Sequence, residues 1–137
     1  MKKDFEIGQS NEIIKSGKIH DLHNLYDYVG IILRGDNCQL QILFTPNSGY
    51  GEGRSPISLC FGGIDYLEFS PNFGSKVISG LDEMGYKKPD DFDDEWLLSQ
   101  EQATNDDHLF LRLDNNSFIR IHSEFATLAE NKKLALQ

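Results

Sequence analysis

The feature that most constrains the fold is a pair of strand-like segments joined by a very short turn. Residues 39–45 alternate apolar and polar side chains with period two, as a half-buried strand does. The apolar members of this stretch are Leu40, Ile42 and Phe44. Residues 25–34 form a second strand pattern, and the turn Gly35-Asp36-Asn37 followed by Cys38 separates the two. The sequence therefore predicts an antiparallel hairpin, because parallel strands need a long crossover.

A second hairpin is expected near the C-terminus. Residues 109–113 and 118–122 have strand composition, and Asp114-Asn115-Asn116-Ser117 joins them. Asn and Asp tolerate positive φ, so this connection is typical of a tight turn. Two further strand segments, 57–61 and 64–69, are interrupted by Gly62-Gly63, which suggests a bulge or a bend.

The spacing of apolar and capping residues predicts a short helix in four segments. The segments are 11–16, 75–84, 95–103 and 124–136, the second with Val77, Ile78, Leu81 and Met84 on one stripe and the last with a Thr127–Glu130 capping-box spacing. No βαβ pattern repeats along the chain. We therefore predict one α+β domain over 1–137, mainly an antiparallel sheet with a few short helices packed on one side. A β-sandwich is the alternative, and 1–18 and 130–137 are expected to be loosely ordered.

Composition excludes several classes of function. The 137 residues carry a formal net charge of −9, which argues against a sequence-independent nucleic-acid binder and against a polybasic membrane contact. No apolar run is long enough to span a bilayer, and the N-terminus lacks an apolar signal core. We expect a cytoplasmic protein.

The negative charge is concentrated in one quarter of the chain. Residues 81–116 contain eleven acids and three bases, a sum of −8. At the centre, aromatic side chains are interleaved with acids: Asp90, Asp91, Phe92, Asp93, Asp94, Glu95 and Trp96. Such a patch would attract a basic partner and offer aromatic anchors to it. The alternatives are a solvated loop before a helix, or a calcium loop, for which the glycine and the ligand spacing are missing.

A glycine-rich loop offers two more candidate contact residues. The stretch 49–55 has three glycines but no Gly-Lys-Ser/Thr ending, and a strand pattern follows it instead of a helix. A hairpin loop is therefore favoured over a phosphate site. Tyr50 and Arg54 lie at its tip, and both residue types are common in binding hot spots.

The histidines and cysteines give weaker signals. His20 and His23 flank Asp21 and could contribute to a metal site only if His108 and His122 converged on them, so a small-molecule or metal-binding module remains an alternative function. Cys38 and Cys60 form no CxxC pair and have no activating neighbour in sequence. We predict no catalytic residue, no resident metal and no cofactor.

The stretch from His20 to Leu25 and the run from Leu59 to Phe69 together resemble small bacterial immunity proteins of contact-dependent and polymorphic toxin systems. The likeness extends over about residues 20–122 and contains no defining motif, so no site residue is transferred. It implies tight binding to one cognate toxin without catalysis. The sequence thus favours an inhibitor of a basic toxin or nuclease domain, acting through its acidic face. A homodimer formed through a sheet edge is a further expectation.

Overall fold

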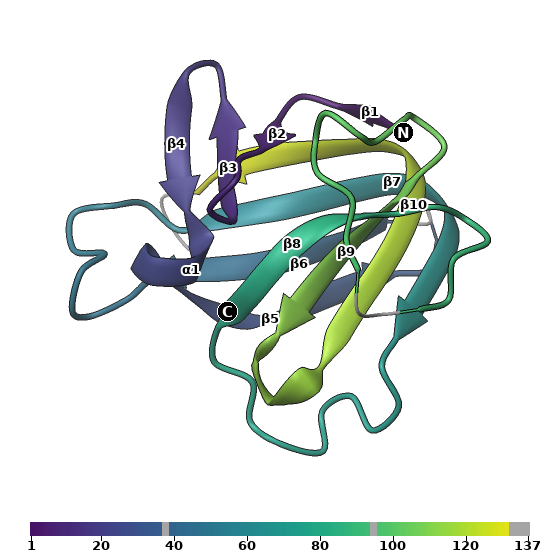
Figure 1. The fold of residues 1–137 in the computed structure, drawn as a ribbon. Coiled ribbons are helices and arrows are strands. Elements are labelled where there is room, and N and C mark those ends of the chain that lie inside the picture. The colour runs from purple at the N-terminus through teal and green to yellow at the C-terminus, as the bar shows by residue number, and fades with distance from the viewer. Residues whose placement is uncertain (37–38, 94–95, 132–137) are drawn as a thin grey trace.

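A curled antiparallel sheet, shaped like half a barrel, makes up most of the molecule (Figure 1). The computed structural model describes residues 1–36, 39–93 and 96–131. The sheet order is β5 (Tyr26–Arg34), β6 (Gln39–Pro46), β7 (Ile57–Phe69), β10 (Phe118–Glu130), β9 (His108–Leu113) and β8 (Leu81–Lys87), and β1 (Lys2–Lys3) runs parallel to the second half of β10.

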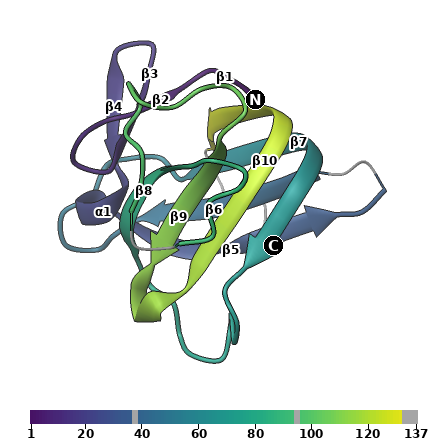
Figure 2. The same ribbon diagram turned by 45° about the vertical axis from the view of Figure 1, so that its right-hand side comes forward.

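A small second sheet and one helical turn close one end of the half-barrel (Figures 1 and 2). The sheet contains β2 (Glu6–Ile7), β3 (Glu12–Lys15) and β4 (Lys18–Asp21), and α1 (Leu22–Leu25) follows it directly. The side chain of Asp21 caps α1 by accepting a hydrogen bond from the Asn24 backbone N–H, at 3.1 Å.

The prediction of an α+β fold with several helices is wrong. Strands account for 54% of the structure and helix for 6%. The segment 11–16 is mostly β3, whose hairpin to β4 turns through Ser16 and Gly17, both at positive φ. The described part of 95–103 is not helical, since Leu98 instead exchanges two backbone hydrogen bonds with Tyr86 on β8.

A β-bulge explains the spacing of three between Leu81 and Met84 in the expected helix 75–84, whose residues 75–80 precede β8 and are not helical. The pairing of β8 with β9 shifts register between Leu81 and Glu83. The extra residue puts Leu81, Met84 and Tyr86 on the core side, so the first two are three apart, as they would be on a helix. The spacing of three residues between Leu81 and Met84 is thus produced by the β-bulge.

Up to Glu130, the segment 124–136 that was expected to be helical is the end of β10, and residues 132–136 lie outside the described residues. This strand pairs with β7 along its whole length, from Ile119 to Glu130. Ala126 and Leu128 are buried, as alternate strand residues should be, and the ring of Phe125 covers Gly62 on the neighbouring strand. The bend predicted at Gly62-Gly63 is present, because Gly63 has φ +65° and the register shifts next to it, between His122 and Ser123.

Both predicted hairpins are confirmed. β5 pairs with β6, and Leu40, Ile42 and Phe44 are fully buried. In β5, however, a register shift between Tyr28 and Gly30 ends the simple alternation expected for 25–34. The β9–β10 turn has Asn115 and Asn116 at φ near +60°, which is the conformation expected there.

The core lies on the concave side of the sheet. It collects the inward residues of every long strand, together with Phe5, Ile13 and Leu22 from the closing end. One backbone hydrogen bond, from Tyr28 N–H to the Ser79 carbonyl at 2.9 Å, joins the start of β5 to the segment before β8. Among the described residues, no helix has the length and apolar character needed to cross a membrane.

Candidate binding surface

The outer face of β7, β10, β9 and β8 carries an unusual set of polar side chains. Since Ile119 and Ile121 point into the core, the residues that alternate with them point outward. The register places Arg120 beside Glu68 and His122 beside Tyr66. The long connection between β8 and β9 crosses this face (Figure 1).

Arg120 attaches that connection to the sheet. Its side chain is buried, and its Nε donates to His108 Nδ1 at 3.0 Å. The two terminal nitrogens donate to backbone carbonyls of the connection, at Asp91, at Lys88 (2.9 Å) and at Pro89 (3.4 Å). One guanidinium therefore fixes the backbone at three points within four residues, which its rigid fork of donors favours.

Lys87 is a second buried cation under the same loop. Its Nζ donates to the carbonyl of Asp93 and lies 3.6 Å from Asp91 Oδ2. Inside the loop, Asp91 N–H donates to the Lys88 carbonyl at 3.0 Å, and Asp93 N–H donates to Asp91 Oδ1 at 2.9 Å. We call residues 88–96 the acidic loop; Asp94 and Glu95 in it lie outside the described residues.

Two large aromatic side chains of the acidic loop face solvent. Phe92 is 75% exposed and Trp96 is 78% exposed. Phe92 is nevertheless held, because the Arg120 guanidinium lies 5.4 Å from its ring centroid and 5.5 Å from that of Tyr66. Before Asp94, the loop therefore presents the Phe92 ring on a backbone that Arg120 and Lys87 hold in place.

His108 is the least exposed titratable group of this face after the two cations. Its ring lies 4.4 Å from that of Tyr66 and 5.5 Å from that of His122, centroid to centroid. Burial lowers the pKa of His108, and the charges of Arg120 and His122 lower it further. His122 contacts Asp65 Oδ1 through Nδ1 at 2.7 Å.

Tyr50 and Arg54 are not part of this surface. They lie in the β6–β7 loop, which projects near α1, whereas the acidic loop lies on the opposite side of the view in Figure 1. Asn47 orders their loop by accepting the backbone N–H groups of Tyr50 (2.7 Å) and Gly51 (2.8 Å) on its Oδ1. Tyr50 is 79% exposed.

The structure does not bring His20 and His23 together in a metal site. His20 is buried and lies 3.5 Å from Glu130 Oε1, whereas the His23 ring contacts the Leu81 carbonyl at 2.6 Å. Within the described ranges, no three His, Cys, Asp or Glu side chains are grouped as metal ligands.

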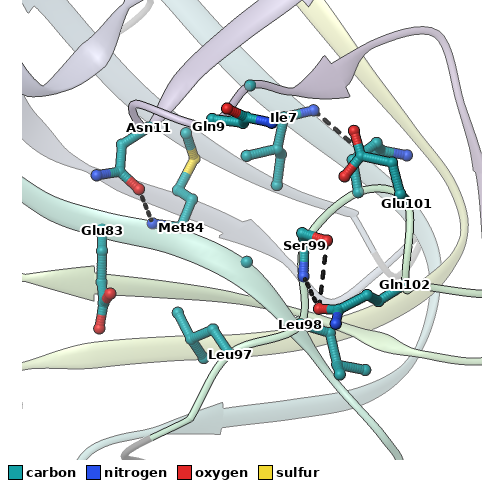
Figure 3. Close-up of a pocket in the computed structure, with 13 residues that line it drawn as sticks. Ile7, Gln9, Asn11, Glu83, Met84, Leu97, Leu98, Ser99, Glu101 and Gln102 are labelled. Carbon is teal, nitrogen blue, oxygen red and sulfur yellow. Dashed lines mark hydrogen bonds between the residues drawn. The ribbon is translucent and has the colours of Figure 1, made fainter.

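A separate polar pocket of about 270 Å³ lies between the N-terminal segment, β8 and residues 97–102 (Figure 3). Several of its polar groups already hold the walls together. Asn11 Oδ1 accepts from Met84 N–H at 3.0 Å, and Gln100 Oε1 accepts from both Ile7 N–H (2.9 Å) and the Tyr86 hydroxyl (2.7 Å). We interpret this pocket as a hydrogen-bonded seam that fixes the segment after Trp96 against the sheet.

Sequence reasoning found the acidic loop but missed what lies beneath it. Lys87 and Arg120 were not singled out, and His108 was considered only as a possible metal ligand, because only strand pairing brings the three together. The one local signal was the position of Arg120 between two isoleucines in a strand pattern. No protein-family model, curated protein or solved structure matches this chain.

Proposed function

We propose that this chain is a non-catalytic binding protein that neutralises a basic protein partner, such as a toxin or nuclease domain, through the acidic loop. The observation that carries the proposal is the pair Phe92 and Trp96, each about three-quarters exposed, with the backbone beside Phe92 fixed from below. Exposed aromatic residues on ordered backbone are typical of binding hot spots, and prior order reduces the entropy lost on association. The resemblance to immunity proteins agrees with this reading.

Charge contributes less than the sequence count suggests. By sequence the loop contains five acids and Lys88, and the cations Lys87 and Arg120 lie directly under it, so these eight charges sum to −2. Most of the attraction of a basic partner therefore comes from the wider acidic segment, and the aromatic pair supplies the main contact.

The test compares capture by matched variants. Tagged protein is incubated with lysate of its own organism, and retained proteins are identified by mass spectrometry. The loop variant is Phe92→Ala/Trp96→Ala. The control is Ile19→Ala/Val77→Ala, which removes two apolar side chains that are also exposed (64% and 83%) but lie outside the acidic loop.

The captured protein is then purified, and its affinity for each variant is measured by calorimetry. We expect a basic protein that binds wild type and control alike and binds the loop variant at least about a hundredfold more weakly, as hot-spot truncation does. Equal affinity for all three would exclude the acidic loop as the binding surface. Loss of binding by Tyr50→Ala/Arg54→Ala alone would assign the function to the β6–β7 loop instead.

A further inference from the structure

The hydrogen bond between Arg120 and His108 defines a single protonation state. A guanidinium Nε always carries a hydrogen, so Arg120 is the donor in this contact. Nδ1 of His108 must then be the acceptor, which requires a neutral ring with its proton on Nε2. The remaining donors of Arg120 hold the carbonyls of Lys88, Pro89 and Asp91.

A proton on Nδ1 would remove the acceptor and place one cation against another. Charged or titratable side chains surround His108 on each of the neighbouring strands. These are Lys87 on β8, Arg120 and His122 on β10, Asp65, Tyr66 and Glu68 on β7, and Asp107 just before His108. Asp65 is already in contact with His122 at 2.7 Å, and Asp107 accepts from the Thr104 N–H at 2.8 Å. Neither therefore provides a dedicated counter-ion for a His108 cation.

We infer that the His108–Arg120 pair is an acid-sensitive latch for the acidic loop. With His108 neutral, Arg120 is held in place and fixes the loop backbone between Lys88 and Asp93. A proton taken from solvent by Nδ1 breaks the contact and frees this stretch. The inference rests on the proposed function only in taking this loop to be the surface that binds the partner. It adds that the partner is released in acidic surroundings.

The direction of the pH effect follows from the lowered pKa of His108. At a pH above the ordinary histidine pKa of about 6.5, His108 is neutral in the folded protein, so the latch is fully closed in that pH range. Because burial, Arg120 and His122 depress the folded-state pKa, the latch opens only as the pH falls below 6.5 and through that lowered value.

The experiment uses the free protein and nuclear magnetic resonance. Ring ¹⁵N shifts report the tautomer and titration of His108 from pH 7.5 to 4.5. Backbone ¹⁵N order parameters report on Asp91 and Asp93, whose N–H groups are hydrogen-bonded inside the loop. We expect the Nε2–H tautomer at pH 7.5, and a fall of these order parameters from about 0.85 to below about 0.6 as His108 takes up its proton. The amide of Ser75, bonded to the Asn72 carbonyl in another loop, should not change.

Two variants separate the latch from a general effect of acid. His108→Asn keeps an acceptor at the position of Nδ1 but does not titrate in this range, so the loop should stay ordered throughout. His108→Leu removes the acceptor, so the loop should be mobile at both pH values. Any of four results would overturn the inference. At pH 7.5 the proton could be found on Nδ1, or His108 could remain neutral down to pH 4.5. The order parameters of Asp91 and Asp93 could stay constant while His108 titrates, or His108→Asn could show the same transition as wild type. None of these readouts needs a partner, so they stand apart from the capture experiment.

Discussion

Arg120→Met tests whether one buried cation stabilises both the acidic loop and the fold. The substitution keeps the length of the side chain and removes every donor. The hydrogen bond to His108 is buried and charge-assisted, which is worth roughly 1.5–3 kcal/mol. The three loop carbonyls regain water when the loop lifts, so they add little, and release of a buried charge offsets part of the loss. We expect a loss of about 2–3 kcal/mol in the free energy of unfolding.

Urea denaturation followed by circular dichroism measures this loss. With an m-value of about 2 kcal/mol/M, the midpoint should fall by about 1–1.5 M. Arg34→Met is the matched control, because Arg34 is exposed and its ion pair with Asp36, at 3.3 Å, should contribute no more than about 0.5 kcal/mol. If Arg120→Met also lost less than about 0.5 kcal/mol, the buried hydrogen bond between Arg120 and His108 would not stabilise the fold in the way its geometry indicates.

Two further substitutions test the strand geometry. Gly62→Ala places a methyl group against the Phe125 ring, so it should lower the free energy of unfolding of the wild type by about 1 kcal/mol. In a Phe125→Ala background the same substitution should cost almost nothing, and a double-mutant cycle measured by urea denaturation tests this. Equal costs in the two backgrounds would mean that the ring does not restrict Gly62. Asn115→Gly should preserve the melting temperature, whereas Asn115→Val should lower stability by about 1–2 kcal/mol, because φ is +60° at this position; similar melting temperatures for both variants would argue against a left-handed residue there.

The hairpins were predictable because their signals are local. Alternation around Ile42 and the Asn115–Asn116 turn each need only a few neighbouring residues, and the structure contains both. One helix was mispredicted for an equally local reason, since the bulge in β8 changed the spacing of the inward residues Leu81 and Met84 to three. Without knowledge of the partner strand, such a spacing cannot be distinguished from a helix.

The groups beneath the acidic loop could not be predicted in the same way. Arg120 contacts Lys88, which is 32 residues away in the chain, and His122 contacts Asp65, which is 57 residues away. These contacts depend on the pairing of β10 with β7 and β9, and no spacing in the sequence encodes that pairing. The sequence therefore indicated the exposed residues of the acidic loop but not the contacts of Arg120, Lys87 and His108 beneath it.

That support changes how the acidic loop should be understood. A flexible acidic segment would attract basic partners of many kinds, because long-range attraction depends on charge and little on shape. Here Lys87 and Arg120 offset part of the loop's negative charge from below, while they fix the backbone that carries Phe92. The loop thereby loses part of its general electrostatic attraction, and the ring of Phe92 gains a fixed position. Discrimination between partners then depends on the fit around Phe92 and Trp96, so anything that disorders the loop should weaken binding even when its charge is unchanged.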